Sequence, residues 1–69
     1  MNKITVLKLP AVIKLSGLAR ATIYKHIKTG NFPQPIKITS KSIGFIEHEI
    51  ENWLQAKADQ RPALNLLKD

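Results

Sequence analysis

The sequence contains no cysteine among its 69 residues. This absence excludes disulfide bonds and thiolate metal sites, and it suits a reducing compartment. His26 and His48 supply the only imidazole groups, and their separation does not match a zinc-binding motif. No apolar run approaches the roughly 20 residues that cross a bilayer, and the N-terminus lacks a signal-peptide pattern. We therefore expect a cytoplasmic protein with no membrane partner, no metal and no other cofactor.

Acidic residues are also missing from the first two thirds of the chain. Residues 1–46 contain eight Lys or Arg side chains and neither Asp nor Glu, whereas residues 47–69 contain all five acids and three cations. The charge therefore divides into +8 and −2, which gives the net +6. A surface that serves only solubility mixes both signs. A region of one sign is typical of a protein that binds a polyanion, although a basic surface without a partner is the simpler alternative.

The short chain has room for one domain. We predict that this domain spans residues 1–61 and that residues 62–69 form a C-terminal tail, because Pro62 interrupts the last helical pattern. The tail contains the apolar run ALNLL, and it is either frayed or a short helix that binds a partner.

The N-terminal segment predicts an extended stretch and a short helix. Residues 4–9 (ITVLKL) are β-branched and apolar, which indicates a short strand or an extended arm. Pro10 suits the first position of a helix, since its missing N–H has no partner there anyway. Val12 and Ile13 are expected to turn inward, with Leu15 as a further candidate. Gly17 suits the left-handed cap that ends the helix.

A second helix is predicted from about Arg20 to Thr29, with its end at Gly30. Ile23 and Ile27 are one turn apart and must face the core. His26 lies nearer the buried side, so we interpret it as a packing residue. Two short helices joined by a turn that contains glycine form a helix-turn-helix pattern. The face opposite the core is predicted to carry Ala21, Thr22, Lys25, Lys28 and Thr29, with Tyr24 at its border.

The segment after Gly30 predicts a hairpin at about residues 36–46. Pro33 and Pro35 hold the chain extended, and Phe32 is the expected apolar anchor of this crossing. The runs IKI and IGFI then flank TSKS, which reads as a turn with a hydroxyl-rich, basic tip. Gly44 in the second run indicates a bulge or a close backbone approach.

The last predicted helix begins near Glu47 and has three acids in its first turns, where the helix dipole favours anions. Ile50, Trp53 and Leu54 follow the spacing of a buried helix face. Trp53 could instead stack on a nucleic-acid base, but its spacing favours core packing. The predicted fold is therefore a small α+β winged helix-turn-helix, with three helices and a two- or three-stranded wing hairpin.

The pattern of polar side chains predicts binding to double-stranded DNA. A helix that enters the major groove needs short or flexible polar groups and no carboxylate near the phosphates, and the helix at 20–29 meets this requirement. Arg20 suits a guanine or a phosphate. A basic hairpin tip suits the DNA backbone or the adjacent minor groove. The candidate DNA-binding residues are Arg20, Ala21, Thr22, Tyr24, Lys25, Lys28 and Thr29 in the helix, with Lys37, Thr39, Ser40, Lys41 and Ser42 in the wing.

The succession LKLPAVIKLSGLARATIYKHIKTGNFPQPIKI, followed by SIGFIEHEIENWL, resembles the AlpA family of short phage and prophage regulators. This family is similar to MerR-like winged helices and to excisionases. The resemblance extends from about Leu7 to Lys57 and is most specific in SGLARATIYKHI and GNFPQPIKI. It implies a DNA-binding protein of a bacterial mobile element. It also places Arg20, Thr22, Tyr24 and Lys25 on the recognition helix and Lys37 and Lys41 on the wing.

Two positions depart from the family pattern. Ala19 precedes the recognition helix where the family often has Ser, and the missing cap costs about 1 kcal/mol of local stability. The wing also lacks the Arg that often precedes the aromatic residue of its second strand. Insertion of a wing Arg into the minor groove is therefore not expected, and Lys41 must supply that charge.

The function predicted on these grounds is transcriptional regulation by a sequence-specific DNA-binding protein of a prophage or integrative element. An excisionase that bends DNA for an integrase is the alternative, because both roles use the same module. So small a module reads few base pairs, which suggests a homodimer or tandem cooperative binding. A protein-interaction module with an acidic partner is a further alternative. An enzyme is not expected, since there is no Cys nucleophile, no Gly-rich phosphate loop and no carboxylate pair in the basic half.

Overall fold

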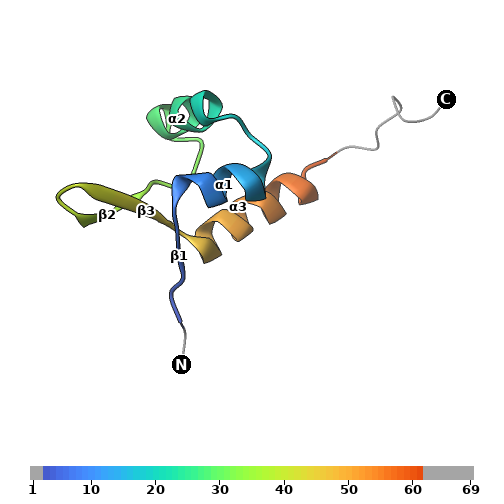
Figure 1. Cartoon of the computed structure of the whole chain (residues 1–69). Coiled ribbons are helices and arrows are strands. Elements are labelled where there is room, and N and C mark those ends of the chain that lie inside the picture. The colour runs from blue at the N-terminus through green and yellow to red at the C-terminus, as the bar shows by residue number, and fades with distance from the viewer. Residues whose placement is uncertain (1–2, 62–69) are drawn as a thin grey trace.

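The computed structural model describes residues 3–61, so the predicted tail at 62–69 lies outside the described residues. Three helices lie on one side of a small sheet, and its β2–β3 hairpin projects away from them (Figure 1). The α+β class is confirmed, and the sheet has three strands rather than two. In chain order the elements are β1 (Val6–Leu7), α1 (Leu9–Ser16), α2 (Arg20–Thr29), β2 (Ile36–Thr39), β3 (Ser42–Ile46) and α3 (Glu47–Asp59).

Helix α1 ends as predicted and begins one residue early. Gly17 has φ 74°, and its N–H donates to the Ile13 carbonyl at 2.9 Å. Pro10 is the second helical residue rather than the first, which is equally tolerated because early helical N–H groups lack intrahelical partners. The inward prediction for Leu15 is wrong, since its side chain is 46% exposed. Val12 and Ile13 define the side of α1 that faces the core. At about 100° per residue, Leu15 lies roughly 110° around the helix from the centre of that side.

Helix α2 has the predicted bounds. Its N-cap residue, Ala19, has extended backbone and makes no side-chain capping bond. Its C-terminal end turns at Gly30, whose φ is 81°, and the Asn31 N–H then donates to the His26 carbonyl at 2.8 Å. Ile23 is fully buried. The C-terminal end of the helix is thus capped by backbone hydrogen bonds, whereas its N-terminal end has no side-chain cap.

The sheet is antiparallel with strand order β1-β3-β2. β1 has two residues within the stretch predicted at 4–9, since Ile4 and Thr5 precede the strand and α1 begins at Leu9. The predicted close approach at Gly44 is confirmed, since a Cβ atom there would collide with Cγ1 of Val6. The strand irregularity lies instead in β2, between Lys37 and Thr39.

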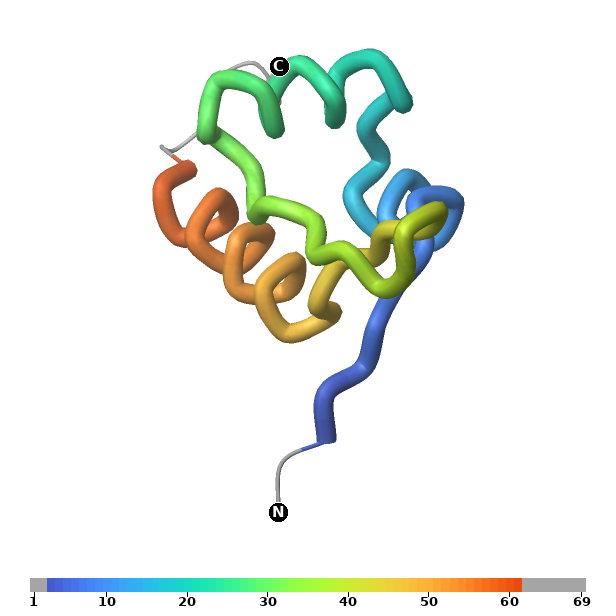
Figure 2. Tube along the Cα trace, turned by 90° about the vertical axis from the view of Figure 1, so that its left-hand side faces the viewer, coloured from blue at the N-terminus to red at the C-terminus, as the bar shows by residue number. Residues whose placement is uncertain are grey.

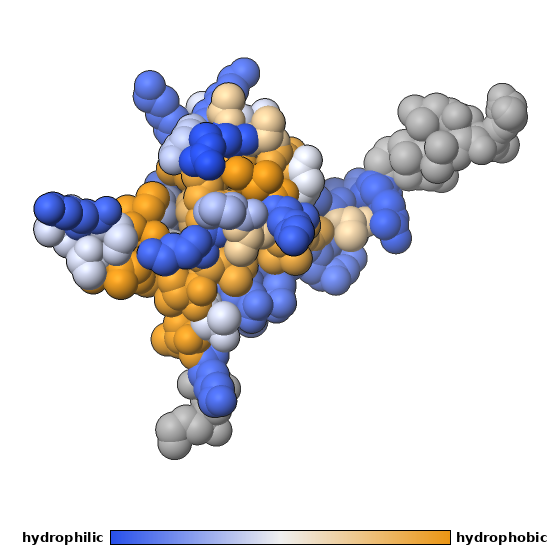
Figure 3. All heavy atoms as spheres, in the orientation of Figure 1, coloured by the Kyte–Doolittle hydropathy of each residue, from blue (hydrophilic) through white to orange (hydrophobic). Residues whose placement is uncertain are grey.

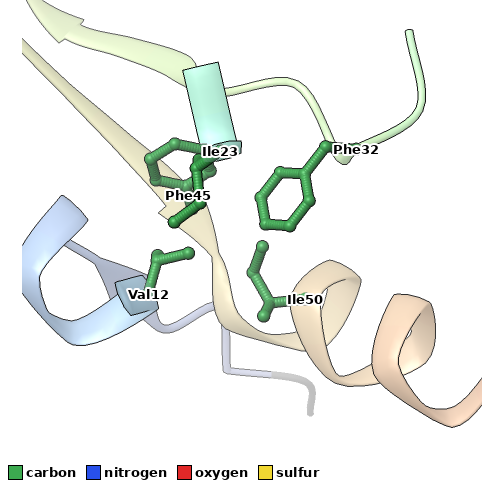
Figure 4. Close-up of a cluster of buried hydrophobic side chains, with 5 residues drawn as sticks. All are labelled: Val12, Ile23, Phe32, Phe45 and Ile50. Atoms are coloured by element: carbon green, nitrogen blue, oxygen red, sulfur yellow. The ribbon is translucent and has the colours of Figure 1, made fainter. Parts of the chain in front are cut away.

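Five segments of the fold each contribute one buried side chain to the core. In Figure 4 these five side chains converge from α1, α2, the crossing after α2, β3 and α3. The rings of Phe32 and Phe45 meet edge to face, with centroids 6.1 Å apart. The predicted role of Phe32 as an anchor is therefore confirmed. The five residues are Val12, Ile23, Phe32, Phe45 and Ile50.

Trp53 joins α3 to the end of α2. Its ring lies 4.7 Å from that of Phe32, and its Nε1–H donates to the Asn31 carbonyl at 2.8 Å. Lys57 Nζ lies 5.2 Å from the centre of the same ring. These contacts confirm that Trp53 is a packing residue. The N-terminus of α3 is held separately, because the Glu47 N–H donates to the Thr5 carbonyl at 2.8 Å.

Candidate nucleic-acid interface

The second helix and the hairpin lie on the same side of the molecule. In Figure 2, α2 crosses the top of the molecule and the hairpin of β2 and β3 projects toward the viewer below it. This arrangement places the two predicted elements of the interface next to each other. Six of the seven candidate residues of α2 are exposed, namely Arg20, Ala21, Tyr24, Lys25, Lys28 and Thr29.

Thr22 differs from the other candidates on α2 because it is half-buried. It precedes Ile23, which is fully buried. Tyr24 on the other side of Ile23 is 47% exposed, in keeping with its predicted place at the border of the polar face. The polar face of α2 is therefore centred on its two lysines rather than on Thr22.

The strand register orients Lys37. Lys37 pairs with Ile43, so the two side chains share one face of the hairpin. Ile43 and Phe45 are two residues apart on β3 and share that face as well. Phe45 belongs to the core cluster that also includes Ile23 of α2. Lys37 therefore lies on the face of the hairpin that is directed toward α2.

Hydroxyl groups shape the tip of the hairpin. The Lys41 N–H donates to Thr39 Oγ1 at 3.1 Å, and the hydroxyls of Thr39 and Ser42 share a hydrogen bond of 3.0 Å. Ser40 and Lys41 form the exposed turn between the strands. Two of the predicted wing hydroxyls thus organise the turn, and this turn presents Lys41 at its tip.

The C-terminal end of α2 is fixed by Gln34 and Asn31, which sequence reasoning missed, and by the candidate residue Thr29. Gln34 Nε2 donates to the Ile27 carbonyl at 2.9 Å. Thr29 Oγ1 donates to the His26 carbonyl at 3.2 Å and accepts from Asn31 Nδ2 at 3.1 Å. The bond from Gln34 joins residues seven positions apart, from the last turn of α2 to the irregular segment after it, so no local pattern indicates it.

The charge of this surface has one sign. No acidic residue occurs before Glu47 in the chain. Figure 3 shows hydrophilic side chains over α2 and at the tip of the hairpin. Within residues 3–61, no group of three His, Cys, Asp or Glu side chains is placed to hold a metal ion. None of the helices in that same range has the length and apolar character that a membrane span requires.

Two helices joined through Gly17, a hairpin beside the second helix and a third helix behind the core define the winged helix-turn-helix class. Within this class, the family model described as prophage CP4-57 regulatory protein (AlpA) matches residues 5–58. The chain therefore belongs to the AlpA family, and the resemblance seen in the sequence is confirmed.

Two relatives extend this comparison. The chain is 40% identical over 62 residues to the DNA-binding transcriptional activator AlpA of Escherichia coli K12, in a match that covers 81% of this chain and 89% of that protein. It is 33% identical over 51 residues to the uncharacterised protein ORF88 of Enterobacteria phage P4. That second match covers 74% of this chain and 58% of the phage protein.

Proposed function

We propose that this protein is a sequence-specific DNA-binding transcriptional regulator of a prophage or integrative element. The exposed face of α2 carries the proposal, because it presents cations beside a lysine-bearing hairpin and has no carboxylate. The E. coli relative, a DNA-binding transcriptional activator, supports the same assignment. The proposed site of action is the bacterial cytoplasm, with double-stranded DNA as the partner.

In this proposal, α2 enters the major groove. Lys25 and Lys28 are exposed and long enough to reach base edges or phosphates, and Arg20 at the start of the helix suits a guanine or a phosphate. Ala21 allows close approach and an apolar contact with a thymine methyl group. Tyr24 places a hydroxyl donor at the end of a rigid ring, which suits a phosphate oxygen.

The hairpin contacts the DNA backbone or the adjacent minor groove. Lys37 and Lys41 supply positive charge, and the exposed Ser40 supplies a hydroxyl and a backbone N–H near the tip. These contacts fix the position of α2 without reading sequence. One module reads few base pairs, so the regulator acts as a pair of copies or as a tandem array.

Enrichment of bound duplexes from a random DNA pool, at near-physiological salt, tests this function. We expect a recovered motif, and a repeated one if two copies bind. Binding that yields no motif and disappears as salt rises would contradict sequence-specific regulation, because only backbone affinity would remain.

Variants then separate the two elements. Lys25→Ala and Thr22→Ala are expected to change the preferred sequence, with the smaller change at the half-buried Thr22. Lys37→Ala and Lys41→Ala are each expected to weaken binding to all sequences similarly and to reduce the salt slope by about 1. An unchanged motif in both α2 variants would remove α2 from base readout.

A reporter assay and a bending assay distinguish regulation from excision. A regulator changes transcription from a promoter that carries the motif. An excisionase bends DNA at clustered sites beside a recombination junction and works with an integrase. Bending without any change in transcription would favour the excisionase role.

A further inference from the structure

The face of the sheet that is turned away from the core is apolar. Val6 pairs with Ile46 and Ile36 pairs with Gly44, and each pair lies on the face opposite Phe45 because neighbouring strand residues alternate. Four aliphatic side chains on this side remain exposed to solvent. Their exposed fractions are 73% for Ile4, 39% for Val6, 39% for Ile36 and 45% for Ile38. We call this surface, which also includes the half-buried Ile46, the outer sheet face.

Gly44 makes the outer sheet face continuous. A Cβ atom at Gly44 would collide with Cγ1 of Val6 and would lie 3.5 Å from Cγ1 of Ile38. The side chains of β1 and β2 therefore approach each other across β3 through the space that glycine leaves. Ile4 extends the surface, since Ile4 and Ile46 line one hollow together with Lys3, His48 and Glu49.

The position of the outer sheet face determines what can reach it. The hairpin lies between α2 and the N-terminal arm in both Figure 1 and Figure 2. The face that carries Lys37 is directed toward α2, so the outer sheet face is directed to the far side of the wing. If α2 lies in the major groove and the wing lies beside it along the duplex, this far side faces the next stretch of DNA. A copy bound there meets the outer sheet face without leaving the DNA.

We propose that two copies of this chain meet through their outer sheet faces when they bind adjacent DNA sites in inverted orientation. The inference rests on the proposed function and identifies the surface that couples the copies. A twofold pair brings the same patch of each copy together, which an uncharged aliphatic patch permits. The rim adds one charge of each sign, from Lys3 and Glu49, so the edge of the pair is not purely repulsive.

The area of the patch explains why DNA is required. The four exposed side chains present on the order of 300 Å² of apolar surface per copy. Two facing patches would bury on the order of 600 Å², below the roughly 1,200 Å² at the lower end of stable interfaces. Adjacent binding raises the effective concentration of one copy near the other to about millimolar, at which a weak contact becomes visible. The contact therefore appears as cooperativity on DNA.

The test compares duplexes that carry one site with duplexes that carry two. The sites are two copies of the selected motif, in inverted or in direct orientation, with the spacing varied over about one helical turn of 10 base pairs. Inverted pairs whose wings point toward each other are expected to bind the second copy about tenfold more tightly than the first, within the usual range of coupling between two sites. Direct repeats are expected to show no such gain.

The double variant Ile36→Thr with Ile38→Thr should remove this cooperativity. Thr keeps β-branching, so the strand is retained, and melting of the variant checks the fold. Its affinity for a single site should stay within about twofold of the original. Ile43→Thr is the matched control, because Ile43 is 43% exposed on the same hairpin but lies on the opposite face. This control should keep the tenfold cooperativity.

The outcomes separate the two ideas. Full cooperativity in a folded Ile36→Thr/Ile38→Thr variant, or cooperativity confined to direct repeats, would overturn the proposed contact and leave the DNA-binding function intact. Failure of the unmodified protein to bind a single site specifically would overturn the proposed function itself, and this inference with it.

Discussion

Helices α2 and α3 pack against the same core and carry opposite charge. Ile23 of α2 and Ile50 of α3 are both fully buried. The exposed side of α2 has cations and no acid, whereas the first turns of α3 contain three glutamates. Because both helices bury an isoleucine in the same core, packing does not explain their difference in charge. We attribute this difference to what the exposed surface of each helix contacts. The α2 surface suits a polyanion, and the α3 surface suits water.

The two helices also differ at their ends. Neither helix has a side-chain N-cap. At the start of α3, however, the Glu47 N–H donates to the Thr5 carbonyl. The negative charges of Glu47 and Glu49 also interact favourably with the positive end of the helix dipole. α2 has no acid in its first turn. Its C-terminal end is instead held by Gln34 and by the Trp53–Asn31 bond. The proposed recognition helix is thus held at its C-terminal end by contacts that leave its polar face exposed.

The largest expected effect tests whether α2 and α3 contribute equally to the stability of the core. Ile23→Ala and Ile50→Ala should each destabilise the fold by about 2–5 kcal/mol, because both remove methyl groups from fully buried sites. Urea unfolding measures both free energies. Leu15→Ala, at a position 46% exposed, is the control and should cost less than about 1 kcal/mol. A large loss for one isoleucine and a small loss for the other would show that only one helix depends on the shared core.

The next effect tests the difference in charge. Lys25→Gln should weaken binding to the selected motif about tenfold, since it removes a charged contact of about 1–3 kcal/mol from the proposed interface. Lys57→Gln makes the same change in net charge on α3 and should alter affinity by less than about twofold. Fluorescence anisotropy with labelled duplex measures both. Equal losses would mean that only the net charge of the protein matters.

A smaller effect tests the connection between the helices. Trp53→Phe keeps a ring against Phe32 but leaves the Asn31 carbonyl without its donor. The expected cost is about 1 kcal/mol, measured by denaturant unfolding. Asn52→Ala, which removes only an exposed bond to His48 within α3, should change stability by less than about 0.5 kcal/mol. Equal stability of Trp53→Phe and the original protein would show that the indole donor is dispensable.

The smallest effect tests the uncapped start of α2. Ala19 has φ −71° and ψ 155°, which suits an N-cap residue, so Ala19→Ser should add about 0.5–1 kcal/mol of stability. The melting temperature should rise by about 2–8 °C. Ala11→Ser inside α1 is the matched control and should lower stability slightly, because Ser forms helix less readily than Ala. No rise for Ala19→Ser would mean that the hydroxyl does not reach the free N–H groups.

Local patterns were sufficient to predict most of the fold. The bounds of α2, the positive φ at Gly17 and the inward turn of Ile50 follow from glycine placement and helical periodicity, which involve neighbours in sequence. The exposed lysines of α2 followed from the same periodicity. The prediction failed for Leu15 because most residues of the eight-residue helix α1 are apolar, so the sequence pattern does not single out one buried side.

By itself, therefore, the sequence determined the three helices, the hairpin, the one-signed charge of residues 1–46 and membership of the AlpA family. Only the tertiary structure decided that Lys37 faces α2, that Gln34 and Trp53 hold the end of that helix, and that aliphatic side chains from β1 and β2 merge over Gly44. The physical reason is the separation along the chain over which each interaction acts. Helix periodicity and glycine conformation act within a few residues, whereas strand register and long-range hydrogen bonds join segments whose separation no local pattern encodes.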